Sequence, residues 1–346
     1  MITGEGAAVL EGARQCEAAA DFPAVVALLK DIPHDELLAE PELGFTLATA
    51  LRRVGEWERA YALTHALGAA CARQGRASLA RRRLNLEAAL HFDRGHLHEA
   101  EVRWAELVDV ASREEDDRMT SDACNNLGVV FTLLARTDEA LASYARALAA
   151  AQRLGDVRGM AQAHQNLAIA YRELGFLHEA GSHFERAVEH ASAAGIDEIL
   201  GRAEEERALV MLAQGDARLA EATATRALNR FRSRGDRAGQ GEALRVLGII
   251  ALARRRFEDA HAHLDDALEL ARACRAPLLE AETLEAIGAL HAVESRRGED
   301  AATSSEPPAA EHALQAAERI FAAMGAEGWG RQLRAGLRAL IASRPR

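Results

Sequence analysis

The sequence predicts an all-α protein, a right-handed α-solenoid in which antiparallel helical hairpins stack one after another. Two observations predict this class. Apolar residues make up 49% of the 346 positions, whereas aromatic residues make up 4% and proline occurs seven times; this composition favours helices and has little strand character. The chain is also longer than one ordinary core usually allows, and small residues recur in it at a fixed interval, which together indicate a repeat array.

The repeat has a period of 40 residues and is carried by three positions. An alanine recurs in six consecutive units, at Ala60, Ala100, Ala140, Ala180, Ala220 and Ala260. Another small residue stands twelve positions before each alanine, and leucine or alanine stands seven positions after it. Small residues at these points let two antiparallel helices approach closely, and larger neighbours then fill the groove toward the next unit.

Glycines mark the expected ends of the helices. One set falls at the turn inside each hairpin: Gly55, Gly95, Gly175 and Gly215. A second set follows the second helix, where a left-handed residue is favoured: Gly75, Gly155, Gly195 and Gly235. Aspartates come directly after or near this second set, and Asp156, Asp197 and Asp236 are predicted to be N-caps of the helices that follow.

Two stretches of the repeat resemble the tetratricopeptide repeat family: NNLGVVFTLLARTDEALASYARALAAA from Asn125 and QNLAIAYRELGFLHEAGSHFERAVEHA from Gln165. The resemblance covers roughly residues 40–325 and concerns the fold, not one function. The period of 40 exceeds the usual 34, and this longer form is similar to the repeats of kinesin light chain, Rap-type bacterial regulators and sensor domains of bacterial transcription activators. Three residues depart from the pattern: Arg207 replaces a core leucine, and His91 and His291 replace large apolar residues.

The repeat phase predicts how the chain is organised. Residues 1–39 are expected to form an N-terminal helical cap or half-repeat, and residues 40–325 about seven repeats with a polar insertion loop at 294–308. Residues 326–346 are expected to form a capping helix. In this helix the predicted inward residues are Leu333, Leu337, Leu340 and Ile341, and the predicted outward residues are Arg331, Arg334 and Arg338.

Charge and cysteine usage exclude several classes of function. The formal net charge is −11, which disfavours direct binding to nucleic acid. The four cysteines lie far apart without a CxxC pair, so they are expected to be isolated thiols of a reducing compartment. The sequence has no signal-peptide pattern and no apolar run long enough to span a membrane. A cytoplasmic protein without membrane association is therefore expected, and the composition, rich in Ala and Arg, suggests a bacterial source.

The motifs of enzymes and metal sites are missing from the sequence. It contains no phosphate-binding loop and no GxSxG elbow, so no catalytic residue and no cofactor is predicted. The histidine pairs His96 and His98, and His261 and His263, are spaced i, i+2 and point to different faces of a helix. Because no HExxH motif or Cys/His cluster accompanies them, no metal site is predicted.

The candidate binding residues follow from the resemblance, because the first helix of each hairpin would line a concave face. The predicted partner-binding residues are Arg82, Asn85, Asp122, Asn125, Asn126, Gln165, Asn166, Arg172, Arg202, Glu205, Glu242 and Arg245, with Glu282 and Glu285 continuing the same positions. Amides can bond to an extended backbone and arginines can grip carboxylates. The resemblance favours Asn125, Asn126 and Asn166, although these amides would equally serve to satisfy polar groups between helices.

The predicted function is a non-catalytic scaffold or adaptor that holds a protein or peptide segment in its concave groove. Ligand binding would act by tightening the superhelix. Two alternatives stay open at this stage. One is a regulatory or sensor subunit of a bacterial signalling or transcription complex, with the effector on another chain, and the other is a self-associating assembly protein.

Overall fold

The computed structural model describes residues 4–18, 21–74, 77–298 and 308–342. Regular structure in these residues consists of eighteen α-helices, without a β-strand. The predicted all-α class is therefore confirmed. Residues 294–298, expected to begin the insertion loop, instead belong to the helix Pro277–Gly298, because the helix continues past the point that the polar composition suggested. Residues 299–307 of the expected loop and the predicted terminating glycine Gly75 lie outside the described residues.

The chain divides into two compact units, Met1–Ala123 and Cys124–Arg346. The first unit contains α1 (Gly4–Ala18), α2 (Phe22–Leu29), α3 (His34–Ala39), α4 (Pro41–Arg53), α5 (Trp57–Gln74), α6 (Ala77–Asp93) and α7 (Leu97–Arg113). The boundary falls within α8 (Asp117–Leu133). In the first unit α4 packs against α5 and α6 against α7, so two successive hairpins form as the repeat predicts.

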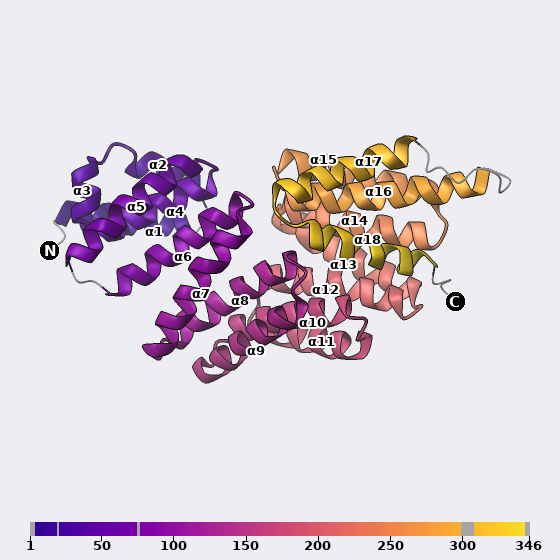
Figure 1. Ribbon diagram of the computed structural model, residues 1–346, viewed down its shortest axis with the longest axis horizontal. Helices are drawn as coiled ribbons and strands as arrows, with labels where there is room; N and C mark the ends of the chain where they lie inside the picture. The colour runs from indigo at the N-terminus through magenta and orange to yellow at the C-terminus, as the bar shows by residue number, and fades with distance from the viewer. Residues whose placement is uncertain (1–3, 19–20, 75–76, 299–307, 343–346) are drawn as a thin grey trace. The chain divides into compact units, whose positions relative to one another are not determined.

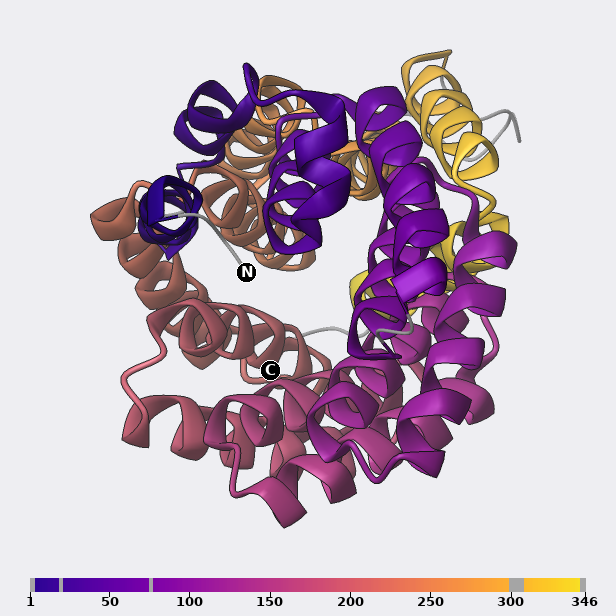
Figure 2. The same ribbon diagram turned by 90° about the vertical axis from the view of Figure 1, so that its left-hand side faces the viewer.

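The second unit continues the hairpins and ends on a single helix. Its helices are α9 (Thr137–Leu154), α10 (Val157–Glu173), α11 (Leu177–Ala193), α12 (Asp197–Ala213), α13 (Ala217–Arg234), α14 (Arg237–Ala253), α15 (Phe257–Ala273), α16 (Pro277–Gly298), α17 (Pro308–Ala323) and α18 (Glu327–Ala342). The paired helices can be followed along this unit in Figure 1 and, from another side, in Figure 2.

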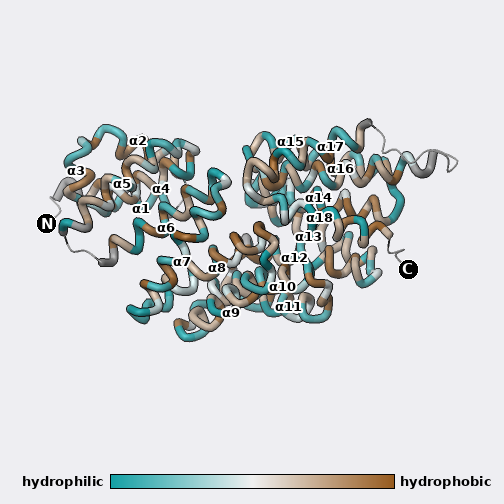
Figure 3. The backbone as a smooth tube through the Cα atoms, viewed as in Figure 1, coloured by the Kyte–Doolittle hydropathy of each residue, from teal (hydrophilic) through white to brown (hydrophobic). Residues whose placement is uncertain are grey.

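The repeat alanines hold the hairpins together as their spacing predicts. All six, from Ala60 to Ala260, are completely buried. At the partner position, a Cβ added to Gly128 would stand 2.4 Å from the Tyr144 ring, so the ring occupies the space that the glycine leaves. Hydrophilic and hydrophobic residues alternate along the helices (Figure 3), as expected when each helix buries one face.

The turns agree with the glycine pattern, with four additions, since Glu115 and Arg275 also have positive φ values, in phase with Gly155 and Gly235. Gly55 and Gly175 have positive φ values of 84° and 81°. Ala135 and Arg255 have positive φ values at equivalent turns without being glycine. Two aspartates cap their helices as predicted, since Asp156 and Asp236 accept bonds from the backbone N–H groups of Gly159 and Gly239.

The prediction for Asp197 was wrong. The N-cap of α12 is Ile196, and Asp197 is the first residue of the helix. Its carboxylate instead pairs with the guanidinium of Arg230 on α13, at 2.9 Å. A basic partner one helix away has therefore replaced the local capping bond.

The second unit is built in two layers. The first helices of its hairpins, α10, α12, α14 and α16, pack against one another in sequence and form an inner layer. Each is covered by the second helix of its hairpin, while α18 packs against α14 and α16. Leu337 of α18 belongs to the same buried cluster as Val246 and Ile250 of α14. None of the described helices has the length and apolar character needed to cross a bilayer.

Candidate ligand-binding cavity

A cavity of about 670 Å³ lies in the second unit between the inner layer and α18. We call it the inner cavity. The inner layer contributes the polar lining residues Gln165, Asn166, Arg172, Glu173, Arg202, Glu205, Glu206, Glu242, Arg245 and Glu282. Apolar residues of α18 form much of the opposite wall, among them Trp329, Leu333, Leu337 and Leu340. The volume falls in the range of pockets that hold small ligands.

The repeat explains why these polar side chains come together. Gln165, Glu205 and Arg245 are 40 residues apart and occupy the same position in α10, α12 and α14. Because these three helices pack side by side, one position of the repeat becomes a row across the layer. Arg202 and Glu242 form a second row three residues earlier in their helices.

Arg245 lies at the centre of the charged lining. Its guanidinium Nη2 is 3.4 Å from Glu282 Oε2 and 3.8 Å from Glu205 Oε1. The side chains of Arg245 and Glu205 are only 6% and 3% exposed. Three successive helices of the inner layer are thus linked through one buried guanidinium group.

A second group of charges surrounds Arg172 near the end of α10. Its Nη2 is 2.8 Å from Glu173 Oε1 and 3.3 Å from Glu206 Oε2. Arg202 Nε is 3.9 Å from Glu242 Oε2. These separations make ion pairs, but most of them exceed the length of a good hydrogen bond.

Several of these buried atoms lack a hydrogen bond. Among the described residues, no group bonds to Arg172 Nε, Arg245 Nε or Glu206 Oε2. A buried polar atom without a partner costs about 1–3 kcal/mol, and native proteins contain few of them. Because these atoms are shielded from solvent, holding the charged lining in place costs the folded protein stability.

The lining carries more negative than positive charge. Three guanidinium groups face five carboxylates, so the fully ionised lining has a net charge of −2. Burial raises the pKa of Glu205 well above its usual range, and the neighbouring Glu242 and Glu206 raise it further. Burial also raises the pKa of Glu242 and of Glu173. The guanidinium groups of the lining therefore do not supply enough positive charge to neutralise all of its carboxylates.

Helix α18 is bound to the inner layer by polar side chains as well as by its leucines. Trp329 Nε1 donates a hydrogen bond to Glu282 Oε1 at 2.9 Å. Arg334 donates to both carboxylate oxygens of Glu285, at 2.9 Å from Nε and 2.5 Å from Nη2, and the Glu285 side chain is fully buried. Gln332 Nε2 lies 3.4 Å from Thr137 Oγ1, at the start of α9.

This arrangement corrects one prediction for the terminal helix. Leu337 faces inward and Arg331 and Arg338 are exposed, as expected. Arg334, predicted to point outward, is only 26% exposed and instead pairs with the fully buried Glu285 carboxylate, and with the exposed Glu318 as well. The reason is that α18 lies against the polar inner face of the hairpins, so that a flank of the helix, and not only its apolar stripe, is covered.

The inner cavity brings together seven of the predicted binding residues: Gln165, Asn166, Arg172, Arg202, Glu205, Glu242 and Arg245. Asn125 is buried on α8, and its Oδ1 accepts a hydrogen bond from Asn166 Nδ2 at 2.8 Å. Asn126 is half-buried and is not among the residues that line the cavity. Asn125 and Asn166 therefore satisfy each other between two helices, the structural role that the sequence left open for Asn166.

The remaining three predicted residues belong to the first unit. Arg82 donates to Glu42 Oε2 at 2.8 Å and stacks over Phe45, with 5.5 Å from its Cζ to the ring centroid. Asn85 accepts a hydrogen bond from Trp104 Nε1 at 2.9 Å. Asp122 is exposed on α8. Arg82 and Asn85 are thus bonded within their own unit and are not part of the inner cavity.

Two kinds of lining residue were not predicted. Glu206 lies 40 residues after Asn166, so the repeat register alone could have identified it. The lining residues of α18, including Trp329, could not be identified in this way, because this helix lies outside the repeat and has no equivalent position in other units.

Comparison with known proteins agrees with this architecture. Models of the tetratricopeptide repeat match residues 123–158 and 199–273. The chain therefore contains tetratricopeptide repeats, as predicted; the first match includes the quoted stretch from Asn125, and the quoted stretch from Gln165 lies between the two matches. No curated protein sequence matches it.

Several solved structures share the fold. A Rap protein complexed with competence and sporulation factor has a TM-score of 0.62 and 13% identity, over 98% of both chains. The Rap conjugation gene regulator of plasmid pLS20, in complex with the Phr* peptide, has a TM-score of 0.59 and 13% identity, over 88% of this chain and 96% of that one. A signal transduction ATPase with a tetratricopeptide repeat sensor, from Pyrococcus horikoshii, has a TM-score of 0.58 and 16% identity, over 90% of this chain and 45% of that one.

Proposed function

We propose that this protein is a non-catalytic regulator or scaffold that binds a short peptide segment in the inner cavity. The observation that carries the proposal is the row of buried, incompletely bonded charged side chains around a cavity of about 670 Å³. Two solved structures of the same fold are complexes with a peptide or a signalling factor by their own descriptions. The cavity size suits a few residues of an extended chain and not a folded domain.

The chemistry of the lining suggests what the peptide carries. The fully ionised lining would carry a net charge of −2, so a basic side chain or a free amino terminus would stabilise the charged form of carboxylates that are expensive to keep charged when buried. Glu242 and Glu205 are the carboxylates best placed for this role, because burial raises the pKa of both. The amides of Gln165 and Asn166 would bond to the backbone of the peptide.

A peptide array tests the proposal. Seven-residue peptides with and without basic residues would be screened against the full chain, and the hits measured by calorimetry. Glu242→Gln should weaken the binding of basic peptides by about tenfold, which corresponds to about 1.4 kcal/mol. The matched control is Glu269→Gln, an exposed residue on α15, which should leave the affinity unchanged.

Two results would contradict the proposal. One is that no peptide binds the chain at all. The other is that hits bind Glu242→Gln and Glu269→Gln with equal affinity, which would move the ligand to another surface. If peptides without basic residues bind, and their affinity depends on Gln165 instead, the inner cavity is the binding site but the proposed preference for a positive charge is wrong.

The position of α18 suggests how binding would be communicated. A peptide in the inner cavity would contact the inner layer on one side and α18 on the other, so occupancy would alter the packing of α18. Trp329 reports on that packing because its indole bonds to Glu282. We expect a change in tryptophan fluorescence on peptide binding that is lost in Trp329→Phe. An unchanged signal in wild-type protein saturated with peptide would show that α18 does not respond.

A further inference from the structure

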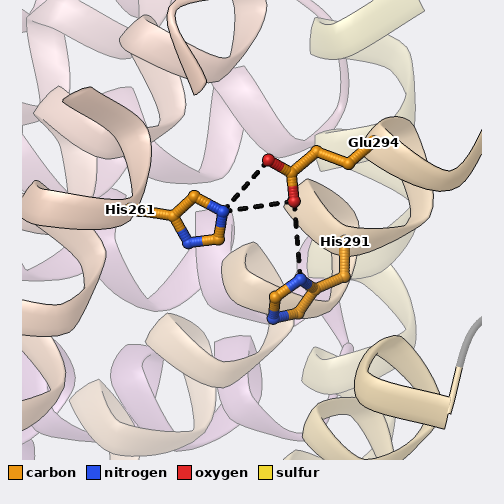
Figure 4. A group of neighbouring side chains, drawn as sticks. All are labelled: His261, His291 and Glu294. Carbon is orange, nitrogen blue, oxygen red and sulfur yellow. Dashed lines mark hydrogen bonds and ion pairs between the residues drawn. The ribbon is translucent and has the colours of Figure 1, made fainter. Parts of the chain in front are cut away.

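Three potential metal ligands converge where α15 meets α16, away from the inner cavity. His261 lies on α15, and His291 and Glu294 lie on α16 (Figure 4). His261 Nε2 is 3.0 Å and 3.1 Å from the two carboxylate oxygens of Glu294. His291 Nδ1 is 3.6 Å from Glu294 Oε2. One ligand atom from each of the three residues lies within 4.8 Å of the others.

The repeat explains the convergence and shows what is unusual about it. Forty residues earlier, Glu221 and Arg254 occupy the positions of His261 and Glu294, and they form an ion pair. Contact between these two positions is thus a feature of neighbouring helices in the array. The third residue is the addition, because the position of His291 is held by Ala251 in the preceding unit and by residues such as Leu51 and Phe131 in others. His91 also stands at this position, but its unit lacks the His261 and Glu294 counterparts, which are Tyr61 and Arg94.

The geometry points to a site for a divalent transition metal of the zinc class, and we propose that His261 Nε2, His291 Nδ1 and the Glu294 carboxylate bind it. Bonds of about 2.0–2.2 Å in a tetrahedral arrangement place ligand atoms roughly 3.3–3.6 Å apart. The shortest His261–Glu294 and the His291–Glu294 separations, 3.0 and 3.6 Å, lie close to that range, and all three ligand atoms lie within 4.8 Å of one another.

The choice of ligands selects the class of metal. Two imidazoles and one carboxylate suit zinc, cobalt, nickel or copper, whereas magnesium and calcium prefer sites made of oxygen atoms alone. The side chains of His261, Glu294 and His291 are 39%, 33% and 29% exposed. Solvent can therefore reach the ion and supply a fourth ligand, which three protein ligands leave open.

A metal at this site would join α15 to α16 through coordinate bonds, where a simple ion pair joins α13 to α14. The ion would then stabilise this end of the array, because it binds the folded chain and not the unfolded one. This inference is independent of the inner cavity and of the proposed peptide ligand.

The test is metal binding by the full chain after removal of metals with a chelator. Zinc affinity would be measured by calorimetry, and cobalt would report coordination geometry through its visible absorption. Wild-type protein should bind one equivalent and gain thermal stability with zinc. His291→Leu, which restores the residue type found at Leu51, should weaken binding by roughly 100-fold or more, since even outer-shell changes cost 10–100-fold.

The matched control is His312→Ala, an exposed histidine on α17 outside the cluster. It should bind zinc as the wild type does, while Glu294→Gln should bind weakly and keep the fold. The proposal is overturned if wild-type protein binds no zinc, or if His291→Leu binds as tightly as wild type. A loss of binding in His312→Ala equal to that in His291→Leu would likewise place the metal elsewhere.

Discussion

The indole of Trp329 donates a hydrogen bond to the Glu282 carboxylate at 2.9 Å, and Glu282 in turn lies 3.4 Å from the buried guanidinium of Arg245. The terminal helix is therefore bonded directly to the charged lining of the inner cavity. A cap that only shielded the end of the stack would need no such bond, since its apolar face would suffice. Helix α18 is part of the candidate site.

The Arg334–Glu285 pair gives the first prediction. Arg334→Met should lower the free energy of unfolding by about 3–5 kcal/mol, because it leaves a fully buried carboxylate without its partner. Combining it with Glu285→Leu should recover most of that loss. Urea unfolding measures both. Arg331→Met, at an exposed position on the same helix, is the control and should change stability by less than about 0.5 kcal/mol; equal losses at residues 331 and 334 would contradict the buried pair.

A second prediction concerns the close approach of helices at Gly128. Gly128→Ala should destabilise the protein by about 1–3 kcal/mol, because the new methyl group would overlap the Tyr144 ring. Gly181→Ala is the matched control, since a Cβ there meets no atom within 4 Å, and it should be neutral or stabilising by up to about 1 kcal/mol. Thermal unfolding distinguishes them. If both behave alike, the repeat phase does not set helix packing.

The histidines between α10 and α11 predict a dependence on pH. His164 Nδ1 is 2.9 Å from His183 Nδ1, and burial, with His183 and His190 adding to it, lowers the pKa of His164 to about 4. The unfolded chain binds this proton near pH 6.5. Between pH 6.5 and pH 4 the unfolded chain therefore binds a proton at His164 that the folded chain does not. The free energy of unfolding is unaffected by the protonation of this residue above pH 6.5 and decreases as the pH falls toward 4.

His164→Gln isolates this contribution. Relative to the variant, wild-type protein should lose on the order of 1–3 kcal/mol of unfolding free energy between pH 7 and pH 4.5. His312→Gln, at an exposed position, should follow the wild-type curve. Parallel curves for wild type and His164→Gln would show that His164 is not held neutral in the folded protein.

The Asn125–Asn166 hydrogen bond leads to a prediction that separates structure from ligand binding. Asn125→Ala and Asn166→Ala should each cost about 1 kcal/mol of stability and should be coupled in a double-mutant cycle. Both substitutions together should weaken peptide binding without unfolding the stack, because Asn166 also lines the inner cavity. Calorimetry with an array-selected peptide is the measurement, and an unchanged affinity would remove the two amides from the binding site.

The fold could be predicted from the sequence because the same helix contact, with the same type of residue, recurs in each unit. One buried alanine could be an accident of composition, but Ala100, Ala140 and Ala180 in phase require the same helix pair three times. The same register predicted most of the polar lining that the inner layer contributes, since Gln165, Glu205 and Arg245 had to form a row once the hairpins stacked.

The remainder depended on contacts that no periodic pattern encodes. The amphipathic pattern of α18 shows that the helix has an apolar face, but not which surface of the array that face covers, and so the prediction for Arg334 was wrong. His261 was compared with His263 on its own helix, whereas its neighbours in space are His291 and Glu294, thirty residues onward. Cytoplasmic location and self-association stay predictions of the sequence.

The charged lining has a consequence for how such an array can change over evolutionary time. Solenoids commonly gain and lose whole units, because each unit contacts only its neighbours. Here α10, α12, α14 and α16 contribute different charges to one group of buried side chains. Arginines in one unit form ion pairs with glutamates in a neighbouring unit. Deleting or duplicating a single unit of 40 residues would shift these partners past one another and leave charges buried alone. The number and order of units in this half of the chain are therefore tied to its electrostatics, and recombination that is harmless in an apolar stack would be selected against here.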